Sequence, residues 1–367
     1  CFQLPIAEAV LDPLRPGTAM VLYPTKALAR DQLRSFTKLD IAELKAGAYD
    51  GDASTQEKVW IRENANVVLT NPEMLHAGIL PRHQKWDALL MRLRYVVIDE
   101  LHVLRGVFGT HVAHVLRRLR RICNHYGSDP TFIFCSATIG QPERLAAALC
   151  GAPVHAVVND GSPRGPRSFA LLDPPLIDDD HGTRSSANSE TASITASLVK
   201  TGHRTITFCR SRKGVELVAA DITRRLPPRL DGKVVAYRAG YLADERRMIE
   251  DNLTAGELSG IVATSALELG VDVGALDACV LNGFPGTIAS MWQQAGRAGR
   301  RSKPSVTVLV AGQDQLDRYL MQHPDEVFSR PAEPSVVNTA NPFILDPHLA
   351  CAAYELPLSY DDLRWWS

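Results

Sequence analysis

The segment Tyr95-Val96-Val97-Ile98-Asp99-Glu100-Leu101-His102 indicates the fold class of this 367-residue chain. An apolar run is followed at once by two carboxylates and, one residue later, by an imidazole. A strand buried on both faces of a parallel sheet reads as such a continuous apolar run. Ligands of these sheets bind at the carboxyl ends of the strands, so Asp99 and Glu100 are expected where a triphosphate and its magnesium ion would lie. Taken alone, the pattern also fits the solvated end of an ordinary strand.

The composition is that of an ordinary globular chain. Hydrophobic residues make up 45% and charged residues 22%, and the formal net charge is -1, so no global basic field points to nucleic acid. A chain of this length suits two domains of common size plus a remnant. No apolar stretch approaches the roughly 18 residues of a membrane span and no secretion signal opens the chain, so we expect a cytoplasmic protein. Seven scattered cysteines without a Cys-x-x-Cys pair predict core residues rather than a zinc site or a disulfide framework.

Short strands rich in Val, Ile and Ala alternate with longer helical patterns, which is typical of parallel α/β sheets. The first series predicts strands near 19–23, 44–48, 67–70, 95–98 and 131–135, and helices such as 26–38 and 111–126. The second series predicts strands at 205–208, 234–237, 261–263, 278–281 and 306–310, and helices at 214–225, 244–253 and 288–297. The predicted fold class is α/β, with two parallel-sheet domains in tandem.

A segment with the composition of a flexible linker separates the two series. Residues 173–190 (DPPLIDDDHGTRSSANSE) combine prolines, an acidic run and small polar residues. We therefore predict a first domain over 1–172, a linker over 173–190, a second domain over 191–332 and a C-terminal extension over 333–367. Two halves joined in this way form a cleft, and interdomain clefts are favoured ligand sites.

The second half supplies cations that could complement the acids. In the segment Gln293-Gln294-Ala295-Gly296-Arg297-Ala298-Gly299-Arg300, two arginines are three residues apart, so a helix would place both on one face. A guanidinium is always charged and matches phosphate oxygens, and two of them can stabilise charge that develops on a transferred phosphoryl group. The alternative is a basic surface helix.

With these segments in order, the chain from residue 1 to about residue 310 resembles the core of superfamily 2 helicases of the DEAD/DEAH-box type. The resemblance implies two RecA-like domains with ATP and Mg²⁺ in the cleft between them, and a single-stranded or duplex nucleic acid as partner. For two of the matching loops, residues 50–52 and 70–75, a turn followed by a capped helix is the alternative. The residues implied to contact nucleic acid are Pro24, Thr25, Lys26, Gly51, Asp52, Thr70, Asn71, Arg210, Ser211, Arg238, Gly240 and Thr264.

The resemblance also implies roles at the nucleotide. Asp99 would hold Mg²⁺ largely through water, Glu100 would contribute to the metal site and activate the attacking water, and His102 would link the acidic loop to the second domain. The residues implied to be catalytic are Asp99, Glu100, His102, Arg297 and Arg300. Those implied to approach the nucleotide are Gly270, Asp272, Gln293, Ser136 and Thr138, the last two by hydrogen bonds directed toward the acidic strand end.

One departure from the family pattern concerns the phosphate-binding loop. No Gly-Lys-Ser or Gly-Lys-Thr sequence is present, although such a loop should cradle the phosphates. Residues 1–7 (CFQLPIA) resemble the helix that follows that loop in helicases. We therefore expect the chain to begin just after the loop, and expect this polypeptide alone to bind ATP weakly and to hydrolyse it only at a background rate.

Two further segments resemble a bacterial branch, the MrfA-like, RecQ-related DNA helicases that contain a DUF1998 region. They are residues 104–123 and residues 341–358, of which the second resembles the opening of a winged-helix region. The resemblance to this branch implies a DNA helicase that moves 3′ to 5′ and acts in DNA repair. It also implies association with the bacterial nucleoid. The arginine-rich stretch 117–121 is expected either as a solvated helix face or as a DNA contact. A non-catalytic nucleic-acid-binding module and an RNA helicase remain alternatives, because the residues do not reveal the sugar preference.

Overall fold

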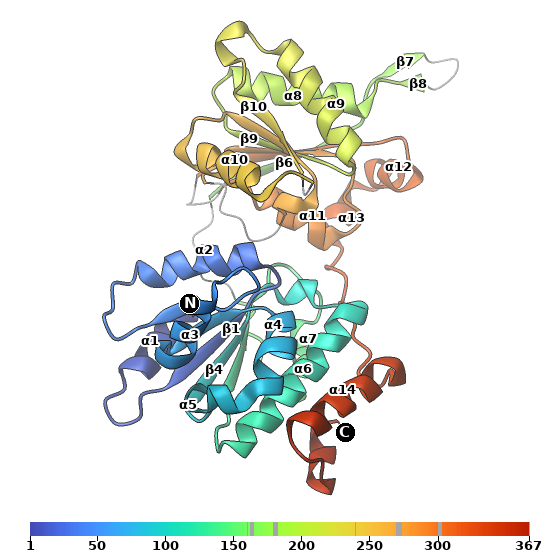
Figure 1. Ribbon diagram of the computed structural model, residues 1–367. Coiled ribbons are helices and arrows are strands. Elements are labelled where there is room, and N and C mark those ends of the chain that lie inside the picture. The colour runs from blue at the N-terminus through green and yellow to red at the C-terminus, as the bar shows by residue number, and fades with distance from the viewer. Residues whose placement is uncertain are drawn as a thin grey trace. The chain divides into compact units, whose positions relative to one another are not determined.

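The computed structural model describes residues 1–159, 161, 165–178, 183–238, 240–268, 274–299 and 303–366. The chain forms two compact units, drawn in Figure 1. Cys1–Val157 and Pro334–Ser367 form the unit called the first lobe, and Val158–Glu333 form the second lobe. The chain therefore leaves the first lobe once and returns to it once.

A five-stranded parallel sheet of order β2-β3-β1-β4-β5 lies at the centre of the first lobe. Its strands are β1 (Thr18–Leu22), β2 (Ala46–Ala48), β3 (Val67–Thr70), β4 (Leu93–Ile98) and β5 (Thr131–Phe134), close to the predicted ranges. Leu22 pairs with both Thr70 and Ile98, and Ile98 pairs with Phe134. This register brings the residues that follow β1, β3, β4 and β5 to one edge of the sheet.

Helices cover both faces of this sheet because successive strand residues point to opposite sides. One face is covered by α1 (Gln3–Leu11) and α2 (Lys26–Thr37), which bury Ile6, Leu28 and Phe36 against the strands. The other face carries the larger apolar cluster. Its helical segments are α3 (Thr55–Asn64), α4 (Pro72–Met74), η1 (Leu75–Ile79), η2 (Leu80–Trp86), α5 (Asp87–Leu90), η3 (Leu101–Val103), α6 (Gly106–His125) and α7 (Pro142–Cys150).

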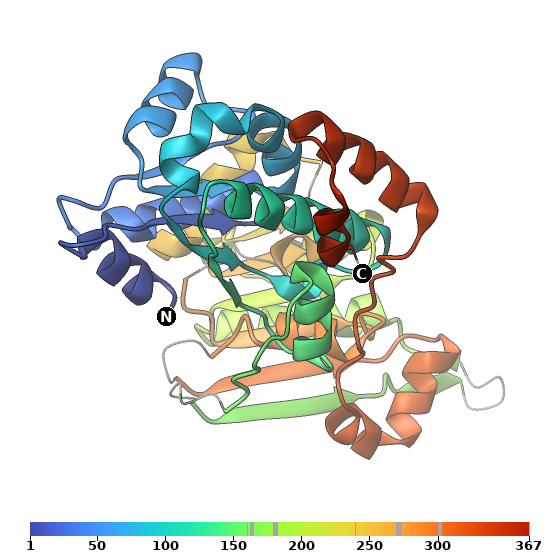
Figure 2. The same cartoon turned by 90° about the horizontal axis from the view of Figure 1, so that it is seen from below.

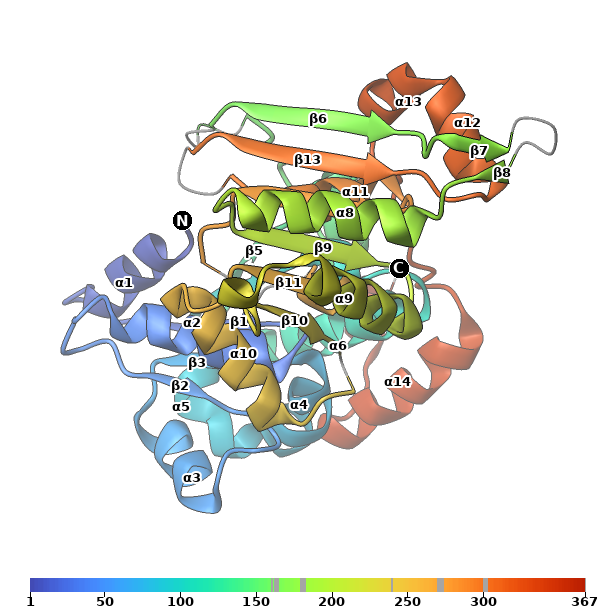
Figure 3. The ribbon, with the colours of Figure 1, turned by 90° about the horizontal axis from the view of Figure 1, so that it is seen from above.

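The second lobe contains a six-stranded parallel sheet of order β10-β11-β9-β12-β13-β6, most of which can be followed in Figure 3. Its strands are β6 (Arg167–Leu172), β9 (Thr205–Cys209), β10 (Val234–Tyr237), β11 (Gly260–Ala263), β12 (Ala278–Asn282) and β13 (Ser305–Val310). Helices α8 (Ala187–Lys200) and α9 (Arg212–Arg225) bury one face. The opposite face is covered by α10 (Ala243–Ala255), α11 (Ile288–Ala295), α12 (Gln315–Gln322) and α13 (Pro324–Ser329), with the short turns η4 (Pro228–Leu230) and η5 (Ser265–Leu267) in the connections.

The predicted domain boundaries at 172 and 190 are wrong. β6 pairs with β13 over its whole length, from Arg167 with Ser305 to Leu172 with Val310, and so belongs to the second sheet. The predicted linker contains the antiparallel pair β7 (Leu176–Asp178) and β8 (Thr183–Arg184), followed by the start of α8. Proline and acid content therefore marked a hairpin within the second lobe, and the first crossing between the lobes lies at Val157–Val158.

The C-terminal residues belong to the first lobe. Helix α14 (Pro342–Glu355) packs against α6, and the turn η7 (Tyr360–Trp365) contacts the same helix (Figure 2). All seven cysteines are free. The prediction that they are core residues is confirmed for the four that are buried, is wrong for the exposed Cys1, and holds only in part for the two that are half-buried, Cys135 and Cys351. Among the described helices, none combines the length and the apolar character needed to cross a bilayer.

Candidate functional site

The two adjacent acids lie where the sequence predicted, directly after β4. The Asp99 amide donates to the Leu22 carbonyl (3.0 Å), which extends the sheet register by one residue. Glu100 then adopts a left-handed conformation, with φ of 54° and ψ of 46°, while its amide donates to Asp99 Oδ1 (2.9 Å). Such a conformation costs a non-glycine residue about 1–3 kcal/mol, and strain of this kind is concentrated at functional sites. His102 Nδ1 lies 3.5 Å from Glu100 Oε2, so the three candidate residues of this loop are brought together.

Burial of Asp99 makes its negative charge costly. The pKa of Asp99 is raised by burial, and the hydrogen bond from the Glu100 amide offsets this only in part. The charge of Asp99 also affects two neighbours. The pKa of Tyr23 is raised, and the pKa of Cys135 is raised to about 11, in both cases first by burial and second by Asp99. A cation beside Asp99 would relieve this cost, because an opposite charge favours the carboxylate.

The donor set of the acidic loop fits Mg²⁺. No group of three or more His, Cys, Asp or Glu side chains in the described part of the chain could hold a metal ion on its own. Mg²⁺ is commonly bound through one or two carboxylates, with waters and substrate phosphates completing its shell. Asp99, with Glu100 beside it, matches that requirement.

Ser136 and Thr138 follow β5 at the same edge of the sheet. Both side chains are exposed, and neither hydroxyl makes a hydrogen bond within the described residues. The predicted bonds toward the acidic strand end are therefore absent from this structure, because the chain turns outward after Cys135, whose carbonyl accepts from the Leu101 amide (2.9 Å). A role for the two hydroxyls at the nucleotide stays a prediction.

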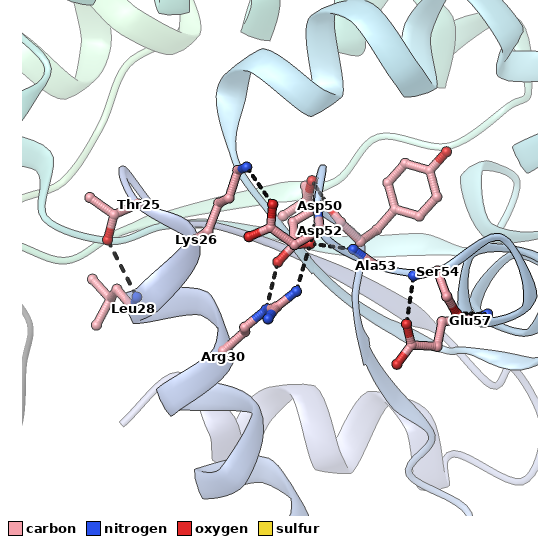
Figure 4. Close-up of polar contacts among 11 residues, drawn as sticks. Thr25, Lys26, Leu28, Arg30, Asp50, Asp52, Ala53, Ser54 and Glu57 are labelled. Carbon is pink, nitrogen blue, oxygen red and sulfur yellow. Dashed lines mark hydrogen bonds and ion pairs between the residues drawn. The ribbon is translucent and has the colours of Figure 1, made fainter. Parts of the chain in front are cut away.

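Figure 4 shows how the loops after β1 and β2 come together. Thr25 caps α2 by accepting from the Leu28 amide (3.3 Å), and Lys26 Nζ lies 2.9 Å from Asp52 Oδ1. The structure thus joins two sets of residues that the sequence predicted separately. Neither Lys26 nor Asp52 is buried, so a phosphate group could reach the ammonium.

An ion pair that the sequence did not predict holds these loops. Asp50 is buried, and Arg30 donates to both of its carboxylate oxygens (2.9 and 3.1 Å). The amides of Asp52 and Ala53 donate to the same carboxylate (2.8 and 2.9 Å). Burial acts to raise the pKa of Asp50, but Arg30 and the two amides keep it below its usual value. Gly51 lies in the loop fixed in this way, where an added Cβ would stand 3.1 Å from Lys26 Nζ.

The prediction of direct nucleic-acid contacts is wrong for the side chain of Thr70. This residue is fully buried and its hydroxyl donates to the Tyr49 carbonyl (2.7 Å), which ties β3 to the end of β2. The Asn71 side chain is also nearly buried and caps α4 by accepting from the Met74 amide (2.8 Å). Both residues stabilise the loop; the alternative of a turn followed by a capped helix describes them better.

In the second lobe, Arg210 and Ser211 follow β9. Ser211 caps α9 by accepting from the Gly214 amide (3.0 Å), and Arg210 pairs with Asp314 (2.7 Å) while remaining 48% exposed. A groove of about 630 Å³ opens beside them. Its polar lining includes Arg184, Ser186, Asn188, Arg210, Ser211, Lys213 and Asn282. The groove therefore combines cations with the amino end of a helix, a combination that suits phosphate oxygens.

The loops after β10 and β11 hold the remaining nucleic-acid candidates. Arg238 donates to Glu216 Oε1 (2.9 Å) and stacks over the Tyr241 ring, with 5.0 Å from its guanidinium carbon to the ring centroid. An added Cβ at Gly240 would stand 3.1 Å from Arg238 Nη1, so this glycine allows the close approach. Thr264 caps η5 by accepting from the Ala266 amide (3.4 Å). Strand register places Tyr237 beside Ala263, so Arg238 and Thr264 follow at one edge.

The sequence predicted that one helix face would carry Arg297 and Arg300, but α11 ends at Ala295, so Arg297 lies beyond the helix. Two turns follow, and Gly299 takes a φ of 76°, a conformation that glycine adopts readily. Arg297 is buried and donates to the Glu268 carbonyl. Three predicted site residues, Arg300, Gly270 and Asp272, lie outside the described residues.

The Glu268 side chain orders α11, a role that the sequence did not reveal. Its carboxylate accepts from Ser290 Oγ (2.7 Å) and from Gln294 Nε2 (2.8 Å). The predicted nucleotide residue Gln293 is half-buried next to Gln294. The sequence shows two glutamines near the end of an otherwise apolar helix. It does not show which of them bonds to Glu268.

Both predictions for the arginine-rich stretch 117–121 are wrong for three of its four arginines. Arg117, Arg118 and Arg121 are buried, so they form neither a solvated face nor a DNA contact, whereas Arg120 is half-buried. Arg118 binds both oxygens of the Glu355 carboxylate, and Arg121 pairs with Asp362 (2.7 Å). These arginines attach the C-terminal segment to α6.

Three family models match the chain. A DEAD/DEAH box helicase model matches residues 1–145, a helicase conserved C-terminal domain model matches residues 190–302, and a model of the winged helix domain of ATP-dependent helicase HRQ1 matches residues 337–367. The chain carries the core of a superfamily 2 helicase. Its two parallel-sheet α/β lobes are the RecA-like domains of such a core, as predicted from the sequence.

Relatives of this helicase core are considerably longer than the chain. The chain is 44% identical to the uncharacterized ATP-dependent helicase YprA of Bacillus subtilis, over 99% of its own length and 49% of the relative. It is 38% identical to the ATP-dependent helicase HRQ1 of Saccharomyces cerevisiae, over 98% of its own length and 35% of the relative. The DUF1998 helicase MrfA bound to DNA and AMPPNP superposes with a TM-score of 0.94 at 44% identity, covering 98% of this chain and 51% of MrfA.

Proposed function

We propose that the intact protein is an ATP-dependent DNA helicase or translocase that hydrolyses ATP at the acidic loop. The observation that carries this proposal is the arrangement at the edge of the first-lobe sheet. There a half-buried Asp99 and a backbone-strained Glu100 lie beside loops that present Thr25, Lys26 and Gly51. The similarity to MrfA bound to DNA and AMPPNP supports DNA and ATP as the two ligands. A DNA substrate would also place the protein on the bacterial nucleoid.

The acidic loop provides the residues for hydrolysis. Asp99 and Glu100 would hold Mg²⁺, which supplies charge stabilisation for the transferred phosphoryl group. Glu100 orients the attacking water and accepts its proton. The hydrogen bond from its amide to Asp99 Oδ1 and the neighbouring His102 restrict its position. A preorganised carboxylate loses little free energy to reorientation during the reaction.

The second lobe provides the complementary charge. Arg297, positioned by the Glu268 carbonyl, and Arg300 are proposed to stabilise the phosphoryl oxygens in the transition state. Gln293, Gly270, Asp272, Ser136 and Thr138 are proposed to contact the nucleotide. A cycle of ATP binding and hydrolysis would favour different positions of the lobes, and the strand would advance with each cycle.

Backbone contacts are proposed to grip the strand. Lys26, Arg210 and Arg238 are each partly exposed and each pairs with an exposed or half-exposed acid, so a phosphate can replace that acid. Contacts of this kind are independent of base sequence and weaken as salt rises. The 3′ to 5′ polarity and a role in DNA repair stay predictions.

The test uses the intact protein with four nucleic acids: single-stranded DNA, single-stranded RNA and the corresponding tailed duplexes. We expect ATP hydrolysis to be stimulated by DNA more than by RNA, and the DNA duplex to be separated only when ATP is present. Binding of nucleic acid without any stimulated hydrolysis would instead support a non-catalytic binding module. Equal or greater stimulation by RNA would replace the DNA helicase with an RNA remodelling enzyme.

A further inference from the structure

The chain passes between the lobes twice, and the two crossings are built differently. At the first crossing, Val157 and Val158 lie in irregular chain and are 86% and 76% exposed. The second crossing is at Glu333–Pro334. There, residues just before and just after the junction are bonded to the lobe to which they belong. Residues Glu333–Asn338 are called the strap below.

The second-lobe end of the strap is bonded to the helix that leads to Arg297. The Glu333 carboxylate accepts from the amides of Ile288 (2.8 Å) and Ala289 (3.2 Å), the first two residues of α11. Thr287 caps the next amide of the helix, that of Ser290 (3.1 Å). The first amides of a helix have no partner within it and favour a negative charge. Glu333 therefore fixes the start of α11 from 45 residues away in sequence.

The first-lobe end of the strap is bonded to two segments. One follows the acidic loop, and the other follows Ser136–Thr138. Pro334 forms a parallel β-bridge with Gly140, two residues after Thr138. The Val336 carbonyl accepts from the Gly106 amide (2.8 Å), four residues after His102. The Asn338 amide donates to Thr110 Oγ1 (3.0 Å), one turn further along α6.

Side-chain packing holds the strap closely on α6. An added Cβ at Gly109 would meet the Leu104 backbone first and would also stand 2.7 Å from Cγ1 of Val337, so the strap lies close to α6 at this glycine. From Glu333 to Val336 there are three residue steps, which span about 11 Å at most when fully extended. The strap therefore has little slack between its two anchors.

We propose that the strap mechanically couples helix α11, which leads to Arg297, to the acidic loop, and that Glu333 is a positioning residue for Arg297. The inference rests on the proposed function and deepens it, because it names the covalent path by which the two halves of the hydrolytic site are kept in step. A misplacement of about 1 Å at a catalytic group can cost on the order of 100-fold in rate. Loss of the Glu333 anchor or added slack in the strap lowers turnover without removing any residue that contacts ATP or DNA.

The first experiment compares Glu333→Gln with Glu245→Gln in the intact protein. Glu245 is the matched control, since its carboxylate accepts from the Leu242 amide (3.0 Å) at the start of α10 in the same lobe, but away from the strap. We expect Glu333→Gln to lower the DNA-stimulated kcat about 10-fold, with the KM for ATP and the thermal unfolding midpoint close to wild type. Glu245→Gln should leave kcat unchanged. Equal kcat in both variants and wild type, or equal losses in both variants, would overturn the proposal.

The second experiment adds slack while keeping every anchor. Two glycines inserted between Glu333 and Pro334 lengthen the strap by about 7 Å, and the same insertion between Val157 and Val158 is the control. We expect the strap insertion to lower the DNA-stimulated kcat several-fold, and the control insertion to leave kcat unchanged. Equal kcat values for the two insertions would overturn the proposal. Absence of DNA-stimulated hydrolysis in the wild-type protein would instead contradict the proposed function itself.

Discussion

The arginines of α6 and the basic residues at the strand ends differ in the solvent exposure of their charged groups and of the partners that bind them. Arg118 is fully buried, and its guanidinium binds Glu355, His76 and His348. Lys26 and Arg210 have 45% and 48% of their side chains exposed, and each pairs with an acid that is itself solvent-accessible. A charge held by buried and half-buried partners serves the fold, whereas a charge held by an exposed partner can exchange that partner for a ligand.

Arg297 does not fit either of these two groups. It is as buried as the α6 arginines, yet it is proposed to act on ATP. Arg297→Ala should lower the DNA-stimulated turnover by about 10³-fold or more, because arginine fingers contribute at that level. The measurement is steady-state ATP hydrolysis, with Arg117→Met as the buried control from α6. If Arg297→Ala hydrolyses ATP normally but unfolds more easily, Arg297 is a structural arginine like those of α6.

Breaking the pair of Arg118 with Glu355 should affect stability rather than catalysis. Glu355→Ala leaves a buried guanidinium without its carboxylate, and loss of one partner of a buried pair typically costs about 3–5 kcal/mol. The midpoint of urea unfolding measures this cost. Replacing both residues, as in Arg118→Met with Glu355→Leu, should restore most of the lost stability, because neither charge is then left unpaired. A loss below about 1 kcal/mol in the single variant would show that the pair does not hold the C-terminal segment.

Histidines around Arg118 should make this attachment sensitive to acid. His348 and His114 are buried near Arg118, Arg117, His76 and His111, and their pKa values are lowered to about 3 and about 4, first by burial and then by Arg118 and Arg117 respectively. A histidine whose pKa is lowered on folding stabilises the protein above its unfolded pKa and loses that contribution as pH falls toward the folded value. Stability should therefore decline below about pH 6.5, the ordinary pKa of histidine.

The measurement is the unfolding midpoint between pH 7.5 and 4.5 for the wild type and for His348→Asn. Asparagine does not titrate in this range, so the variant should lose less stability than the wild type over the same interval. The difference should amount to about 1–3 kcal/mol at the acidic end. Parallel curves for the two proteins would contradict the role of His348.

The smallest effect is expected at the exposed pair of Lys26 with Asp52. Asp52→Asn frees the ammonium for a phosphate group, so affinity for single-stranded DNA should rise by less than about 5-fold, since solvent weakens an exposed ion pair. Asp12→Asn is the matched control, because Asp12 pairs with Arg94 (3.0 Å) at the start of β4, the opposite end of the strand from Asp99. Equal gains in both variants would reflect net charge alone and would remove Lys26 from the strand-binding residues.

The sequence predicted the elements and the site better than the tertiary connections. Each predicted strand is present because a buried parallel strand has a local apolar signature, and the acids follow β4 because that signature ends at Ile98. Residues 167–172 were placed in the first domain and not predicted as a strand, since the pairing of β6 with β13 joins segments 138 residues apart in sequence. No local pattern reports such a partner.

Charged residues show the same limit. The α6 arginines carry the sequence pattern of a solvated face, and only the packing of α14 and η7 explains why Arg118 and Arg121 are buried. The pair of Arg30 with Asp50 and the anchor at Glu333 were missed for the same reason. Residues at strand ends were predicted because parallel strands bring their carboxyl ends together whatever the partner sequence.

The central claim is that Glu100 activates water for ATP hydrolysis driven by DNA. The most direct measurement is the DNA-stimulated turnover of Glu100→Gln in the intact protein, together with its affinities for ATP and single-stranded DNA. The account predicts a loss of about 10²–10⁴-fold in turnover, the usual contribution of a general base, with both affinities close to wild type. Turnover at the wild-type rate would contradict it.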